Sequence, residues 1–132
     1  MRIEEFVNKY NGRYLEADGA YWYQCVDLTK KWQQENGWGV THGNASQWPV
    51  NANKNEYQWI ANGIRNKPEP GDIVVFSGNG KYGHIAVCIS ANYLNLTCLE
   101  QNRPLRSPCH VVYTRNYGLG TSMPVRGWLH HK

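Results

Sequence analysis

The chain has 132 residues and a formal net charge of +4, and we expect one domain spanning residues 1–132. Leu, Ile, Val and Phe make up just under a fifth of it, but six Trp and nine Tyr supply a core, because each such ring buries ~150–250 Å². No apolar run approaches the ~18 residues of a membrane helix, and basic residues form no run longer than two, so we expect binding to neither membranes nor nucleic acid.

A helical half is predicted over residues 1 to about 67. The first helix is expected from residue 3 to residue 11, because apolar side chains recur there at helical spacing, at Ile3, Phe6, Val7 and Tyr10. A second helix is expected from Gln24 or Cys25 to Asn36. Between residues 42 and 63 we expect short helical turns anchored by Trp48 and Trp59.

A β half is predicted over residues 68 to about 132. Pro68 and Pro70 mark a rigid approach to the first of five apolar segments with strand composition, at residues 72–76, 84–89, 94–102, 109–114 and 125–129. Strands at short spacing after a helical half indicate an α+β fold. We expect helices packed on an antiparallel sheet of five to six strands.

The four cysteines, at positions 25, 88, 98 and 109, show no CxxC or CxxH spacing, so a structural zinc site is not expected. The N-terminal segment carries acids where a signal peptide would be apolar, which favours synthesis in the cytoplasm. Free thiols are therefore predicted rather than two disulfides.

Cys25 lies at the predicted start of the second helix. Unpaired backbone N–H groups and the helix dipole stabilise a thiolate at such a position. A buried core cysteine is the alternative, because free cysteines are often buried. A catalytic role requires a base nearby.

Strand periodicity supplies a candidate base in His84. The side chain of His84 shares a strand face with Ala86, and on the next strand Cys98 and Glu100 share a face. A hairpin centred on Asn92 would place Ala86 opposite Cys98 and His84 opposite Glu100. Opposed Cβ atoms lie ~4.5–5.5 Å apart, close enough for a carboxylate to orient an imidazole.

These residues predict thiol chemistry on an amide. The Cys25 thiolate would attack a carbonyl, His84 would take and return the proton, and Glu100 or Asn102 would fix the imidazole tautomer. The backbone N–H of Cys25 and the side chain of Gln24 are the candidate donors to the oxyanion. We also expect Trp48 to contact substrate.

The segment before Cys25 concentrates acidic residues. Counted from Glu16 as position one, Asp18 is at position three and Asp27 at position twelve, while Ala20 and Trp22 offer carbonyls at five and seven. This is the ligand spacing of a twelve-residue calcium loop, although Gly19 stands at position four instead of six. Solvated loop carboxylates and a helix-capping Asp27 are the alternative.

The sequence resembles the CHAP domain, the cysteine, histidine-dependent amidohydrolase/peptidase of phage endolysins and bacterial autolysins. The resemblance rests on motifs in the family's order, at residues 18–27, 43–45, 71–76, 83–85 and 99–102. It implies a papain-like fold, with Cys25 as nucleophile, His84 as base, Glu100 as orienting acid and Asn102 as assisting amide.

The resemblance also implies a calcium ion on the loop described above, with Glu16 where the family usually has Asp. The substrate would be bacterial peptidoglycan, cut either at the glycan–peptide amide or within the peptide. An enzyme without a signal peptide fits a phage endolysin, made in the host cytoplasm and acting on the wall after release. We expect a monomer with no organic cofactor.

Three other functions remain open at this stage. A non-catalytic wall-binding module would use the many aromatic side chains to stack on sugars. A thiol acyltransferase would share the nucleophile and the base. A zinc hydrolase would survive iodoacetamide and lose activity to a zinc chelator, whereas the thiol enzyme would do the opposite.

Overall fold

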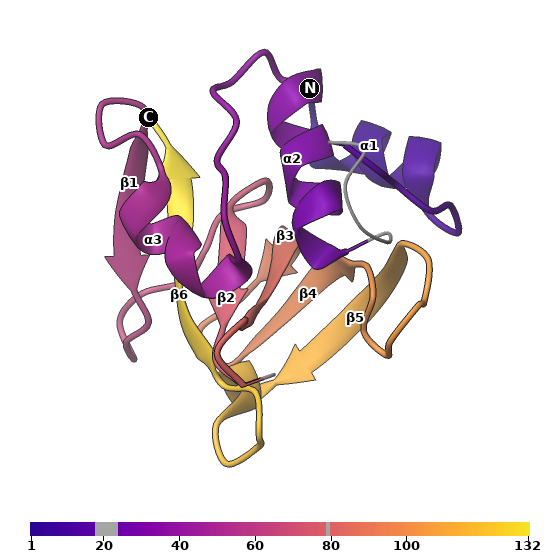
Figure 1. The fold of residues 1–132 in the computed structure, drawn as a ribbon. Helices are drawn as coiled ribbons and strands as arrows, with labels where there is room; N and C mark the ends of the chain where they lie inside the picture. Colours follow the sequence, from indigo (N-terminus) through magenta and orange to yellow (C-terminus); the bar gives the residue numbers. More distant parts are fainter. Residues whose placement is uncertain (18–23, 79) are drawn as a thin grey trace.

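The computed structural model describes residues 1–17, 24–78 and 80–132, which form three α-helices, two short 3₁₀ segments and six strands (Figure 1). The helical segments are α1 (Ile3–Tyr10), α2 (Cys25–Glu35), η1 (Ala45–Gln47), α3 (Trp48–Asn51) and η2 (Asn116–Gly118). The strands are β1 (Tyr57–Ala61), β2 (Ile73–Phe76), β3 (His84–Ala91), β4 (Asn95–Glu100), β5 (His110–Arg115) and β6 (Val125–His131).

The strands form a single antiparallel sheet in the order β1-β6-β2-β3-β4-β5. Strands β2 to β5 follow the chain as a meander, since each pairs with the next. β6 returns across the sheet and inserts between β1 and β2. This expected α+β architecture is confirmed.

The helices cover one face of the sheet, with α2 in front of β3 (Figure 1). Phe6 of α1 and Trp32 of α2 meet edge to face, with ring centroids 5.1 Å apart. On the sheet side they pack in one cluster with every second strand residue, including Val75, Ile85 and Val87. The apolar stripe predicted for the first helix therefore faces the core.

The other face of the sheet has its own buried cluster. Val74, Ala86 and Cys88 point to this side, where Trp128 is fully buried and the η2 residue Tyr117 packs against them. Because both faces are covered, β2 is a continuous apolar run with all four residues buried.

The four cysteines are free thiols in the structure, as predicted.

One strand departs from the predicted helical half. β1 lies at residues 57–61, where we expected helical turns, and Trp59 belongs to it. β1 pairs with β6, about seventy residues later in the chain. Local sequence patterns therefore could not predict this pairing. Apart from β1, the strands begin at Ile73, and apart from the short segment η2, the helical segments end at Asn51.

The predicted β3–β4 register is wrong by two residues. Cys88 lies opposite Cys98, where we expected Ala86. The turn lies later than predicted, with Asn92 and Asn95 joined by a backbone hydrogen bond, and the register shifts once more between Cys88 and Ser90. A two-residue slip keeps every side chain on its face, so His84 and Glu100 still share one side.

Within the described part of the chain, no helix combines the length and apolar character needed to cross a membrane.

Candidate active site

Three element ends converge at one place in the fold. Cys25 is the first residue of α2, His84 is the first residue of β3, and Glu100 is the last residue of β4. His84 is 3% exposed and Glu100 is fully buried, while Cys25 is only half-buried. The arrangement therefore has an accessible thiol backed by a buried histidine and carboxylate.

The contacts of His84 define this site. Its Nε2 lies 2.8 Å from Glu100 Oε1, which leaves Nδ1 as the nitrogen available to the thiol. Burial lowers the pKa of His84, but hydrogen bonds to Cys25 and to Glu100 outweigh it and raise the pKa to about 9. The imidazolium form is thus favoured where it bridges a thiol and a carboxylate.

The start of α2 is held by Asp27, which is 1% exposed. Asp27 Oδ2 accepts the backbone N–H of Gln24 at 2.8 Å, and Oδ1 accepts that of Ala17 at 3.3 Å. An aspartate that takes orphan N–H groups at a helix start stabilises the helix. Asp27 therefore stabilises the first turn of α2, which begins with Cys25.

Gln101 provides a second fixation that the sequence reasoning missed. This fully buried side chain donates to the carbonyls of Leu15, at 2.9 Å, and Gln24, at 2.8 Å, and accepts the Leu15 N–H at 2.7 Å. Gln101 follows Glu100 directly at the end of β4. Two consecutive residues therefore bond the two parts of the site: Glu100 contacts His84, and Gln101 contacts the start of α2. The only sequence feature that could have indicated this role is the position of Gln101 next to Glu100.

A cavity of about 500 Å³ opens in front of Cys25. Part of its wall is formed by Tyr82 and Gly83 of the Gly-rich turn and by Asn44 and Ala45 at the start of η1. These two segments are joined by a hydrogen bond, because the Ser46 N–H donates to the Tyr82 carbonyl at 2.9 Å. Gly83 has a φ of +72°, and a Cβ there would lie 3.0 Å from Ser46 N. Glycine thus allows the two segments to close against each other beside His84.

Tyr82 is a cavity residue that the sequence reasoning also missed. Its side chain is 52% exposed at the rim of the cavity, while its backbone is fixed by Ser46. An aromatic ring held on a rigid turn beside the thiol presents a surface to a bound substrate. Its position two residues before His84 was the only sequence signal.

Of the predicted substrate-contacting residues, Gln24 lines the cavity and Trp48 does not. The prediction for Trp48 is wrong: its side chain is fully buried, and its Nε1 donates to the Gly43 carbonyl at 3.1 Å. Asn102 also lines the cavity, but its Oδ1 accepts the Arg106 N–H at 2.6 Å. Its assistance to His84 stays a prediction.

The predicted calcium ligands are only partly visible. Asp18, Ala20 and Trp22 lie outside the described residues. Glu16 is exposed, and Asp27 is the buried capping residue. Among the residues that the structure describes, no three His, Cys, Asp or Glu side chains gather closely enough to hold a metal.

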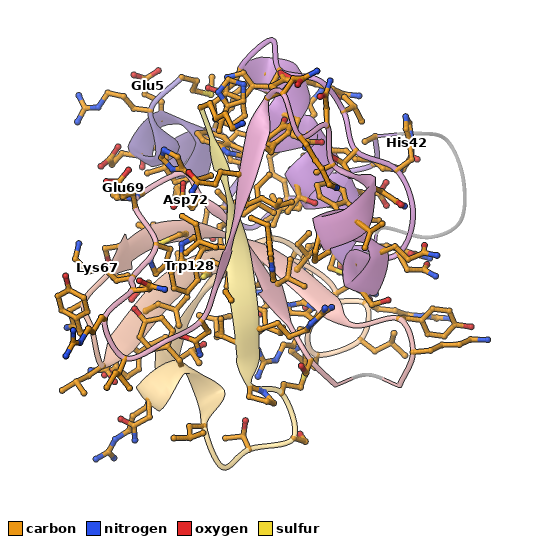
Figure 2. The ribbon with its side chains drawn as sticks, turned by 90° about the vertical axis from the view of Figure 1, so that its left-hand side faces the viewer. Glu5, His42, Lys67, Glu69, Asp72 and Trp128 are labelled. Atoms are coloured by element: carbon orange, nitrogen blue, oxygen red, sulfur yellow. The ribbon has the colours of Figure 1, made fainter. Side chains whose placement is uncertain are left out.

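A second cavity, of about 430 Å³, lies away from the thiol. It is lined by Trp32, Trp38 and Asp72, and Asp72 is bonded to His130 at 2.8 Å. Figure 2 shows Asp72 in the left half of the view and His42, two positions before the cavity residue Asn44, in the right half. Among the described residues that line this second cavity there is no cysteine, whereas Cys25 lines the first.

The site thus combines a half-buried thiol at a helix start with a buried histidine–carboxylate pair, on an α+β scaffold. The family model described as the CHAP domain matches residues 15–102, a range that holds Cys25, His84, Glu100 and Asn102. The chain belongs to the CHAP domain family.

Two solved structures share the fold. The wild-type endolysin LysIME-EF1 is 24% identical, with a TM-score of 0.79 over 97% of this chain and 62% of that one. Ly7917, solved with the hydrolysis product of MDP, is 16% identical, with a TM-score of 0.64 over 99% of this chain and 63% of that one. The chain thus spans less than two thirds of each of these proteins.

Proposed function

We propose that this domain hydrolyses an amide bond of bacterial peptidoglycan, as an N-acetylmuramoyl-L-alanine amidase or as a peptidoglycan endopeptidase. The observation that carries the proposal is the chain of contacts from Cys25 through His84 to Glu100 beside an open cavity. Membership of the CHAP family and the likeness to an endolysin support the choice of substrate.

In the proposed reaction the Cys25 sulfur, as thiolate, attacks the carbonyl carbon of the amide. The oxyanion that forms is stabilised by the Cys25 backbone N–H and by the Gln24 side chain. The protonated His84 gives its proton to the leaving nitrogen, the C–N bond breaks, and a thioester remains on Cys25. His84 then takes a proton from water, which attacks the thioester and releases the acid and the thiol.

Glu100 acts through His84 in this scheme. Its carboxylate accepts from Nε2, which keeps Nδ1 directed at the thiol and stabilises the imidazolium of the ion pair. Asn102, at the cavity wall, is the proposed assisting amide.

Calcium is proposed as a structural ion on the segment before Cys25. The described residues fit this role in their chemistry: Asp27 is a carboxylate at the start of α2, Glu16 is an exposed carboxylate eleven positions earlier, and calcium prefers oxygen ligands. Glu16, Asp18 and Asp27 would supply carboxylates, and Ala20 and Trp22 carbonyls. The ion would neutralise these acids and order the approach to Cys25.

The test is clearing of a suspension of purified Gram-positive cell walls. The wild type should clear the suspension, and Cys25→Ala should fold and bind but clear nothing. Iodoacetamide should abolish clearing, whereas a zinc-selective chelator should leave it unchanged. Sedimentation with the walls without clearing would instead support a binding module, and clearing by Cys25→Ala would exclude the thiol mechanism.

A further inference from the structure

The guanidinium of Arg103 contacts the same carboxylate oxygen as the active-site histidine. Its Nη1 lies 3.4 Å from Glu100 Oε1, and His84 Nε2 lies 2.8 Å from that oxygen. The two nitrogens are therefore within about 6 Å of each other. The second oxygen, Glu100 Oε2, is buried with no hydrogen-bond partner among the described residues, so Oε1 carries both contacts.

A second contact fixes Arg103 in this position. Its guanidinium carbon lies 5.6 Å from the centre of the Phe76 ring, and that ring lies 5.5 Å from the His84 ring. A guanidinium over an aromatic face is attracted by the ring quadrupole. The Arg103 side chain is 34% exposed and Glu100 is fully buried, so the arginine links the buried pair to the surface.

We infer that Arg103 is a positioning residue of the active site, which holds the Glu100 carboxylate and limits how strongly it favours protonated His84. The inference rests on the proposed function, because it assigns a role within that reaction. Without the arginine, the full negative charge of Glu100 would act on the imidazole. His84 would then release its proton to the leaving nitrogen less readily.

The remaining charged or titratable groups around the pair do not replace Arg103. On the described elements packed against it these are the Cys25 thiol, the buried Cys98 thiol and His110, which lies opposite Glu100 on β5. His110 Nδ1 is bonded to the Pro108 carbonyl at 2.8 Å. Arg103 is thus the permanent positive charge in contact with Glu100.

The pKa of His84 is the quantity on which this role would act. Hydrogen bonds to Cys25 and Glu100 raise it to about 9 against the opposing effect of burial. A positive charge within about 6 Å lowers the pKa of an imidazole, by roughly 0.5–1 pH unit when solvent screens it. Removal of the Arg103 charge should therefore raise the pKa of His84.

The test is an NMR titration of the His84 ring in the full chain. Arg103→Met should raise the pKa of His84 by roughly 0.5–1 pH unit. Arg103→Gln gives a second neutral replacement should the Met variant not fold. Arg103→Lys keeps the charge and should titrate like the wild type, and so should the matched control Arg115→Met, on an exposed residue at the far end of β5.

Wall clearing measured against pH in the same variants gives the functional readout. The loss of clearing at high pH should move upward in Arg103→Met and Arg103→Gln, and the maximal rate should fall several-fold. A His84 pKa that is unchanged or lower in both folded neutral variants would overturn the inference. If the wild type cleared no walls, the proposed function would fail, whereas the NMR titration would still decide the role of Arg103.

Discussion

Replacing Glu100 by Gln removes the charge behind His84 while keeping the shape of the side chain. The rise in the pKa of His84 from 6.5 to about 9 corresponds to roughly 3 kcal/mol in favour of the imidazolium, gained from Cys25 and Glu100 against burial. A hydrogen bond to a charged group contributes ~1.5–3 kcal/mol. We therefore expect the pKa of His84 to fall by about 1–2 pH units in Glu100→Gln.

The same substitution should slow wall clearing near neutral pH roughly tenfold to hundredfold, because the ion pair with Cys25 loses its support. The melting midpoint should change little, because the glutamine amide keeps the shape of the side chain and a carbonyl oxygen for His84 Nε2 without burying a charge. NMR titration of His84 and initial clearing rates measure both effects, and Glu69→Gln, an exposed carboxylate beside His130, is the matched control. A folded Glu100→Gln with an unchanged His84 pKa would refute the reasoning.

Three further outcomes are expected. A thiol reagent should modify one cysteine quickly in the native protein and all four in denaturant. The reason is that burial raises the pKa of Cys88 and Cys109 to about 12 and that of Cys98 well above its usual range. More than one rapidly modified thiol in the native protein would contradict this. Tyr82→Ala should raise KM several-fold with little change in kcat and Tyr82→Phe should not, as measured on a soluble wall fragment; equal effects of the two would show that the ring face is not used. Calcium at a hundredfold excess over Kd should add ~2.7 kcal/mol and raise the melting midpoint by several degrees in the wild type but not in Asp18→Ala, with little effect of magnesium. Superimposable wild-type curves in calcium and EGTA would remove the ion from the account.

Much of the site follows from local sequence patterns. The start of α2 at Cys25 is set by helix-capping chemistry around Asp27, and the shared face of His84 and Glu100 follows from strand periodicity. This explains why the pair was found although its register was wrong by two residues. Face depends only on whether a position is odd or even, whereas register depends on where the turn falls.

The features that escaped prediction depend on contacts between distant segments. β1 forms against β6, and Gln101 acts by bonding Leu15, 86 positions away. Trp48 is buried in the core, although Asn44 and Ala45, a few positions earlier, line the cavity. Arg103 is only three positions from Glu100, but its contact with the ring of Phe76, 27 positions earlier, depends on the fold.

Mass spectrometry of peptidoglycan digested by the wild type and by Cys25→Ala tests the central proposal most directly. Hydrolysis of an amide through Cys25 predicts new free amines paired with new carboxylates, present with the wild type and absent with the variant. A new N-terminal alanine would identify an amidase, and new ends within the peptide would identify an endopeptidase. Intact amides with the wild type, or the same new ends with Cys25→Ala, would contradict the account.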